Sequence, residues 1–146
     1  MNKNKGYANL RKGRYSEIGF HYHIVISTKD RRPVFRDFTL SRSFIACLKE
    51  SDDSNFTDTL SFVIMPDHIH WLFILKYEPI SKCIQRVKSQ FSRESKLKIW
   101  QQGFYDHGIR NNQSLLEISR YIVANPLRGG LVDHIGEYPH WDSAWL

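Results

Sequence analysis

The 146-residue sequence has no apolar run close to the about 20 residues that a membrane-spanning helix needs. Its basic first segment, residues 1–15, is not followed by the apolar stretch of a secretory signal. Cysteine is scarce, because Cys47 and Cys83 are the only two, and their spacing does not fit a metal site. We therefore expect no association with a membrane, and free buried thiols in a reducing cytoplasm.

The sequence also lacks internal repeats and low-complexity segments, and its glycines form no phosphate-binding motif. These absences favour a single domain over residues 1–146, with a basic N-terminal arm (1–18) and an aromatic C-terminal tail (129–146). Hydrophobic residues make up 41% of the chain and aromatic residues 14%, which is enough to form a sizeable core.

Acidic residues are outnumbered, since 15 Asp and Glu stand against 21 Lys and Arg and leave a net charge of +6. The positive charge is concentrated in residues 3–14, 29–32 and 82–98, and aromatic residues are interleaved with it. This pattern is typical of a protein that binds a polyanion. Nucleic acid is favoured over a membrane surface, because no basic segment has a strong apolar stripe without a core to cover it.

Strands are predicted where apolar residues alternate or run together. Residues 19–28 alternate and are rich in β-branched and aromatic types, which predicts one strand. Two apolar runs, 59–65 and 68–75, are separated only by Pro66 and Asp67, and this spacing predicts an antiparallel hairpin.

Three helices are predicted from apolar residues at helical spacing, at 37–51, at 79–97 and from Ser114 to Pro126. A polar loop is expected after the first of them, at 51–55. Ser114 begins the last helix in a capping box, and Pro126 is expected to stop it. The resulting order, β-α-β-β-α-α, predicts an α+β sandwich with one antiparallel sheet and helices on one face.

Two histidine pairs are candidate metal ligands. His68 and His70 alternate along one strand, so their side chains lie on one face with Cα atoms roughly 6–7 Å apart. The alternative is a pair of ordinary polar strand residues, although buried imidazoles in so apolar a strand would need partners. His21 and His23 have the same spacing, which therefore does not separate the two pairs. If the two strands are neighbours, one pair could support the other from behind the ligands.

The last predicted helix contains a candidate nucleophile. Tyr121 and Asn125 are four residues apart, which places them on one helix face, and Glu117 extends the same line. A phenol has a pKa of about 10 and attacks phosphate only when a metal polarises the target or a neighbour takes the proton. The amide oxygen of Asn125 could bind that metal. The alternative is that Tyr121 is a packed aromatic residue with its hydroxyl group at the surface.

Four segments of the sequence together resemble the REP-associated tyrosine transposases, which are single-tyrosine HUH transposases of small insertion sequences. Any one segment is a modest signal, but an HIH strand and a YIxxNP helix in one short basic protein make a strong combination. The segments occur in the family's order over residues 20–132 and are STKDRRPVF, FVIMPDHIHWL, FYDHGIR and YIVANPLRGGLV.

The resemblance implies a ferredoxin-like fold of the HUH endonuclease type, in agreement with the predicted element order. It implies that His68 and His70 hold a Mg²⁺ or Mn²⁺ ion, that Tyr121 is the nucleophile and that Asn125 gives the third ligand. The other histidine pair matches no ligand of the family. The implied substrate is single-stranded DNA beside a short imperfect hairpin, cleaved and rejoined through a covalent 5′-phosphotyrosine. The implied location is the bacterial cytoplasm, in association with the nucleoid.

Several basic residues are candidate DNA contacts, although a solvated face explains those on the 79–97 helix equally well. His107 belongs to one of the matching segments, and we expect a structural role or a DNA contact for it. The tail aromatics Tyr138, Trp141 and Trp145 either stack on unpaired bases or cover the core, and we favour the core. The candidate DNA contacts are Arg31, Arg32, Lys82, Arg86, Lys88, Arg93 and Arg110.

Two other functions are compatible with the sequence. One is a domesticated protein that binds DNA hairpins without cutting them, and the other is a metal-dependent nuclease in which water attacks and Tyr121 is structural. Because each chain has a single candidate tyrosine, two cleavages need two subunits or two rounds. A monomer and a homodimer are therefore both compatible with the sequence.

Overall fold

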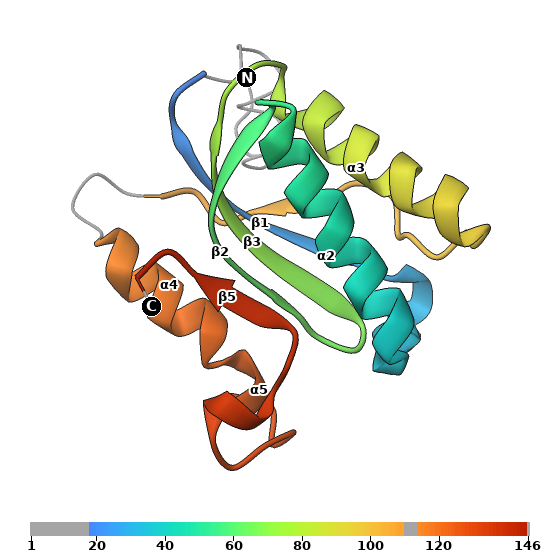
Figure 1. Cartoon of the computed structure of the whole chain (residues 1–146), viewed down its shortest axis with the longest axis vertical. Helices are drawn as coiled ribbons and strands as arrows, with labels where there is room; N and C mark the ends of the chain where they lie inside the picture. The colour runs from blue at the N-terminus through green and yellow to red at the C-terminus, as the bar shows by residue number, and fades with distance from the viewer. Residues whose placement is uncertain (1–17, 110–113, 146) are drawn as a thin grey trace.

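The computed structural model describes residues 18–109 and 114–145, and these form a five-stranded antiparallel sheet flanked by helices (Figure 1). The strands lie in the order β4-β1-β3-β2-β5, so the hairpin of β2 and β3 occupies the middle of the sheet beside β1. The α+β class and the antiparallel sheet are therefore confirmed. The strands are β1 (His21–Ser27), β2 (Thr57–Ile64), β3 (His68–Leu75), β4 (Tyr105–Asp106) and β5 (Trp141–Ser143).

The helices have the predicted positions but partly different ends. The first helix continues to Asp53, so the expected polar loop at 51–55 begins later than predicted. The last predicted helix ends at Val123, and Pro126 lies in the first turn of a further short helix, where its missing N–H costs no hydrogen bond. The helices are α2 (Phe38–Asp53), α3 (Ile80–Ser95), α4 (Leu115–Val123) and α5 (Asn125–Arg128).

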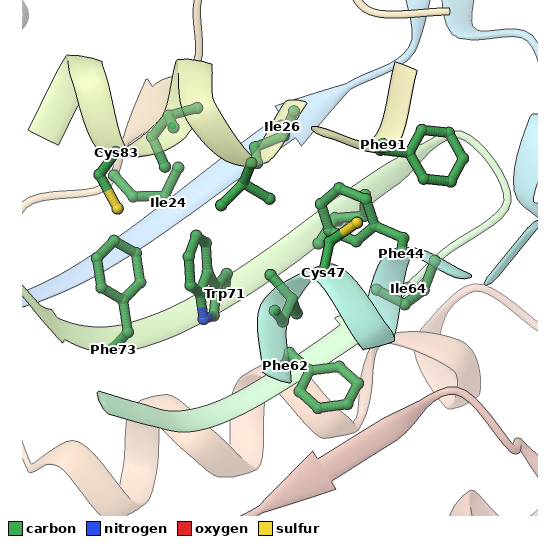
Figure 2. Packing of buried hydrophobic residues seen from close by; sticks show 14 of the residues in the cluster. Ile24, Ile26, Phe44, Cys47, Phe62, Ile64, Trp71, Phe73, Cys83 and Phe91 are labelled. Carbon is green, nitrogen blue, oxygen red and sulfur yellow. The ribbon is translucent and has the colours of Figure 1, made fainter. Parts of the chain in front are cut away.

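One face of the sheet is covered by α2 and α3, which lie side by side (Figure 1). Alternate residues of the strands point into this layer, among them the fully buried Trp71 and Phe73 of β3. Figure 2 shows these side chains together with Cys47 of α2 and Cys83 of α3. Both cysteines are buried and free, as predicted, and burial raises the pKa of each thiol to about 12. This layer is the main hydrophobic core.

The opposite face of the sheet is covered by α4, whose Ile118 and Ile122 pack against Val63, Met65 and Leu72. The prediction that all helices lie on one face was therefore wrong for α4. The physical reason is the alternation of the strands, because Val63 and Leu72 are apolar residues on the second face and need a cover there.

The aromatic tail is less loop-like than expected, because it contains β5, which pairs with β2 at the edge of the sheet. Tyr138 donates its hydroxyl hydrogen to the backbone oxygen of Ile64. Tyr138 and Trp141 both pack on the smaller core beneath α4, as favoured, whereas Trp145 is 42% exposed and does not cover the core as expected. Across the described part of the chain, none of the helices has the length and apolar character needed to cross a bilayer.

Candidate active site

The two histidines of the hairpin lie on the face of the sheet that α4 covers. Ile69 and Trp71, between and beside them in β3, point into the main core, so His68 and His70 point the other way. Their ring centroids are 5.2 Å apart. His70 is buried at 6% exposure, whereas the side chain of His68 is partly accessible. The predicted pair is thus together on one face, with one member deep and one near the surface.

His68 is oriented by the residue before it. Its Nδ1 lies 2.8 Å from Oδ1 of Asp67, and Oδ2 of Asp67 accepts a hydrogen bond of 3.1 Å from Arg31 Nε. Burial alone would raise the pKa of Asp67, but the hydrogen bonds and charges of His68 and Arg31 lower it. An ionised carboxylate only accepts hydrogen bonds, so Nδ1 of His68 carries a proton, and Nε2 takes no part in this contact. Arg31 therefore contacts the site through Asp67, and its Nη2 also lies 3.4 Å from Nδ1 of His68.

His70 has a different partner, the imidazole of His23 on the neighbouring strand β1. Nε2 of His23 and Nδ1 of His70 are 2.9 Å apart. Burial first of all, together with the neighbouring histidines and Arg128, lowers the pKa of His70 from 6.5 to about 2. Burial and His107 likewise lower the pKa of His23 to about 3. Both rings are therefore neutral near pH 7, the state in which an imidazole offers a lone pair to a metal ion.

The donor set fits a divalent cation. The hydrogen bonds found among the described residues use Nδ1 of His68 and Nδ1 of His70 and leave Nε2 of both rings for another partner. Ligating imidazoles ordinarily bind through one nitrogen while the other is held by a neighbouring polar group. Nitrogen ligands combined with oxygen ligands suit Mn²⁺ at least as well as Mg²⁺. His68 and His70 are therefore suited to hold the ion that the sequence led us to expect.

A second histidine cluster shares one member with this pair. Ligand atoms of His23, His70 and His107 all lie within 4.8 Å of one another, and such a group could also hold a metal ion. The rings of His23 and His107 are stacked, with centroids 4.2 Å apart and an interplanar angle of 7°. The sequence suggested that the pair His21 and His23 could support the pair His68 and His70. It did not predict that His107 contacts either pair. The only signal for His107 was its place in the segment FYDHGIR.

Tyr121 lies on α4 and faces the histidines. Its ring and that of His70 are in edge-on contact with centroids 6.2 Å apart, and the tyrosine is 49% exposed. A cavity of about 340 Å³ lies beside it and is lined in part by His23, His107 and Glu117. The predicted nucleophile therefore stands next to the predicted metal ligands at an opening that solvent can enter.

Arg128 of α5 is a site residue that the sequence reasoning missed. Its guanidinium carbon lies 3.9 Å from the centroid of the Tyr121 ring, and the same side chain donates a 2.7 Å hydrogen bond to the backbone oxygen of Tyr121. Arg128 thus holds the tyrosine through both its ring and its backbone. The signal was present in the segment YIVANPLRGGLV, but a spacing of seven residues does not show that the chain turns back there.

Asn125 is not on the same helix as Tyr121, because α4 ends at Val123 and Asn125 begins α5. Its side-chain amide donates a 3.1 Å hydrogen bond to the backbone oxygen of Ile122. Hydrogen bonds to His68 or His70 are not among those it forms with the described residues. Its role as third metal ligand therefore stays a prediction.

Among the basic residues predicted to contact DNA, Arg31 pairs with Asp67, and the other described ones fall into two groups. Lys82 and Arg93 of α3 are exposed, and Arg32 is exposed with weak hydrogen bonds of 3.4 Å to backbone oxygens. Arg86 is instead paired with Glu78 at 2.7 Å, and Lys88 donates to the backbone oxygens of residues 101 and 103. Arg110 lies outside the described residues. A DNA contact stays a prediction for all of them, with Lys82 and Arg93 the best placed on α3.

Comparison with known proteins agrees with this geometry. The family described as "Transposase IS200 like" matches residues 16–125. A REP-associated tyrosine transposase of Escherichia coli K12 is 27% identical, in an alignment that covers 86% of this chain and 78% of that protein. A solved structure of a REP-associated tyrosine transposase bound to a REP hairpin has a TM-score of 0.76 and 24% identity, and covers 88% of this chain and 79% of that one. The family match covers residues 16–125, which is most of the chain, and a related structure has the same fold. This chain therefore belongs to the IS200-like transposase family.

Proposed function

We propose that this transposase cleaves and rejoins single-stranded DNA beside a hairpin, with Tyr121 as the nucleophile and a divalent ion held by His68 and His70. The observation that carries the proposal is the edge-on contact of the rings of Tyr121 and His70, with centroids 6.2 Å apart. This contact brings α4, which carries the tyrosine, against β3, which carries the histidines. A nucleophile and the two ligands of a metal ion must lie this close together if both are to act on one phosphate.

The histidines have a defined part in this proposal. His68 and His70 would hold the ion, with Nε2 of each ring available for it, and Asn125 would be the third ligand. The bound ion supplies a positive charge that polarises the scissile phosphate and stabilises its developing negative charge. His70 is buried and its pKa is lowered, so protons compete weakly with a metal ion for its nitrogen.

Tyr121 performs the covalent step. Its hydroxyl oxygen attacks the phosphorus in line, the bond from phosphorus to the 3′ oxygen breaks, and the DNA 5′ end becomes a phosphotyrosine. The phenolic proton passes to solvent, which reaches the half-exposed side chain, and the departing 3′ oxygen takes a proton from solvent. The phosphotyrosine ester conserves the energy of the phosphodiester. A second 3′ hydroxyl can therefore reverse the reaction and join a different strand.

A hairpin substrate is supported by the related structure, which is that of a REP-associated tyrosine transposase bound to a REP hairpin. The present chain carries a net charge of +6, and the exposed Lys82 and Arg93 lie on α3. Binding to the DNA backbone releases counterions, so affinity should fall as salt rises. We expect stronger binding to single-stranded DNA with a hairpin than to a blunt duplex.

The experiment that tests the proposal is a covalent-adduct assay. The full chain is incubated with labelled hairpin DNA that carries single-stranded flanks, in Mn²⁺ or in EDTA, and then run on a denaturing gel. We expect a protein–DNA adduct in Mn²⁺ and none with Tyr121→Phe, which removes one hydroxyl group and little packing. A protein that binds the hairpin without cutting would give no cleavage. A nuclease that uses water would cleave without forming an adduct.

The matched control is Tyr105→Phe. Tyr105 lies on β4, is 62% exposed and makes edge-on contact with His107, so it is a second accessible tyrosine near the site among the described residues. We expect this variant to form the adduct as the parent does. An adduct that persists in Tyr121→Phe but disappears in Tyr105→Phe would assign the nucleophile to Tyr105.

A further inference from the structure

His23 has no part in the proposed reaction, yet its Nε2 lies 2.9 Å from Nδ1 of His70. We propose that His23 is a positioning residue, which keeps the proton of His70 on Nδ1 so that Nε2 is free to bind the metal ion. The inference rests on the proposed function, because it assumes that His70 is a ligand.

The fold fixes this contact from both sides. Strands β1 and β3 are antiparallel neighbours, in which His23 stands opposite Leu72 and Val25 stands opposite His70. His23 and His70 are thus diagonal neighbours on one face of the sheet, within reach of each other. Both are buried, at 5% and 6% exposure, so water competes little for the hydrogen bond.

The proton between the two rings decides which nitrogen of His70 can bind a metal. Two neutral imidazoles joined by one hydrogen bond share a single proton on the line between them. If Nδ1 of His70 donates to Nε2 of His23, then Nε2 of His70 keeps a lone pair. If His23 donates instead, Nε2 of His70 carries a proton and cannot be a ligand. The first arrangement is the one that the proposed ion requires.

His23 would do for His70 what Asp67 does for His68, since each occupies Nδ1 of a ligand ring. The difference is that Asp67 is acidic, whereas His23 is neutral. His107 braces His23, because the two rings are stacked at 4.2 Å and the backbone N–H of His107 donates a 2.9 Å hydrogen bond to the backbone oxygen of His23. The plane of the His23 ring is therefore held before any ion binds.

The competing interpretation is that His23, His70 and His107 bind the ion themselves. Their ligand atoms all lie within 4.8 Å of one another, which is close enough to bind one ion. However, the lone pairs of an imidazole lie in the plane of its ring, and the rings of His23 and His107 are stacked within 7° of parallel. Two stacked rings direct their lone pairs along parallel planes and do not converge on one ion without moving. The geometry therefore favours a positioning role.

The test measures Mn²⁺ binding to the full chain without DNA, by electron paramagnetic resonance of the free ion. We expect His23→Ala to weaken Mn²⁺ binding by about 10- to 100-fold, the usual effect of removing a group behind a ligand. His23→Gln should recover part of the loss, because its side-chain oxygen can accept the proton of His70. His21→Ala, on the same face of β1 two residues away, is the matched control and should leave Mn²⁺ binding unchanged.

A second readout needs neither metal nor activity. Nitrogen-15 NMR of the histidine rings in EDTA reports which nitrogen of His70 carries the proton. We expect Nδ1 in the parent and in His23→Gln, and a shift of the proton toward Nε2 in His23→Ala. A merely structural role for His23 would alter the thermal midpoint without moving the proton of His70.

Two further variants separate the possible failures. If His68→Ala abolishes Mn²⁺ binding while His23→Ala leaves it unchanged, the positioning role is overturned and the proposed ligand pair stands. If His107→Ala abolishes Mn²⁺ binding while His68→Ala leaves it unchanged, the ion is bound by the three-histidine cluster. That outcome overturns both the positioning role and the ligand pair of the proposed function.

Discussion

The two faces of the sheet differ in what they bury. On one face, α2 and α3, each of 16 residues, cover a continuous core in which Trp71, Phe73 and Phe91 are fully buried. On the other face, the nine-residue α4 covers a smaller core. The histidines and the cavity beside Tyr121 lie on this face. The same strands supply both faces, because alternate residues point in opposite directions.

This difference indicates a division of labour within one sheet. The α2/α3 face buries many large apolar side chains and should contribute most of the stability. The α4 face buries fewer large apolar side chains, and among them lie histidines whose lowered pKa keeps them neutral near pH 7. If the division is correct, substitutions on the first face should change stability with little effect on chemistry, and those on the second face should do the reverse.

The largest effect should come from removing the metal ion from the second face. EDTA, or His68→Ala, should reduce DNA cleavage to background, because the phosphate is then no longer polarised. The thermal midpoint of the metal-free protein should change little with His68→Ala, since the side chain of His68 is partly accessible. Cleavage and midpoint are measured on the same preparations. Undiminished cleavage in EDTA would show that the reaction does not need a metal ion.

The first face should respond in the opposite way. Phe91→Ala should lower the free energy of unfolding by about 3–5 kcal/mol, because a fully buried ring in contact with Phe35, Phe44 and Trp100 is replaced by a cavity. Denaturant unfolding measures the loss, and adduct formation per folded molecule should stay near the parental value. Phe20→Ala, at a ring that is 57% exposed, is the control and should cost far less. A large loss of adduct per folded molecule would show that the faces are coupled.

Asn125→Ala sharpens the comparison at the end of α4. If the amide is the third ligand, both the apparent Mn²⁺ affinity and cleavage should fall, with partial rescue at high Mn²⁺. The alternative follows from its hydrogen bond to the backbone oxygen of Ile122, whose loss should cost about 1 kcal/mol of stability. Metal titration of cleavage beside the thermal midpoint distinguishes the two. Unchanged metal dependence with a lowered midpoint would exclude Asn125 as a ligand.

The buried histidines should also make the second face sensitive to acid. The pKa values of His23 and His70 are lowered from 6.5 to about 3 and about 2, so the native state resists protonation that the unfolded state accepts. Their contribution to the free energy of unfolding is therefore complete above pH 6.5 and is lost as the pH falls toward 3. Unfolding in EDTA across this range should show the decline. The double variant His23→Gln, His70→Gln should flatten it, and an unchanged slope would contradict the assignment.

The smallest effect is expected on α3, where two lysines look alike in the sequence. Lys82→Gln should reduce the slope of log affinity against log salt by about 1 if this exposed side chain contacts a phosphate. Lys88→Gln should instead lower the thermal midpoint, because Lys88 holds the backbone oxygens of residues 101 and 103. Hairpin-binding titrations at several salt concentrations measure the first effect. Equal salt slopes for the parent and Lys82→Gln would make this part of α3 a solvated face.

Much of the fold could be predicted from local patterns. The strand at 19–28, the hairpin around Pro66 and the helix capped by Ser114 were predicted, and all three are confirmed to within a few residues. The Ser114 cap is a contact between residues three apart, where its side chain accepts from the N–H of Glu117. Such signals survive in a sequence because they involve neighbours. The side of the sheet on which α4 packs was not predicted, because it depends on which apolar residues of distant strands lack a cover.

The sequence by itself determined the chemistry that is available to this protein: an H-x-H strand, a tyrosine on an amphipathic helix and an excess of positive charge. These are properties of residue type and near spacing. Only the tertiary structure decided how they meet, with His23 against His70 and Arg128 over the ring of Tyr121. The physical reason is that hydrogen bonds and ring contacts act over a few ångströms in space, whatever the separation along the chain. His23 and His70 are 47 residues apart, and strand pairing alone brings them to 2.9 Å.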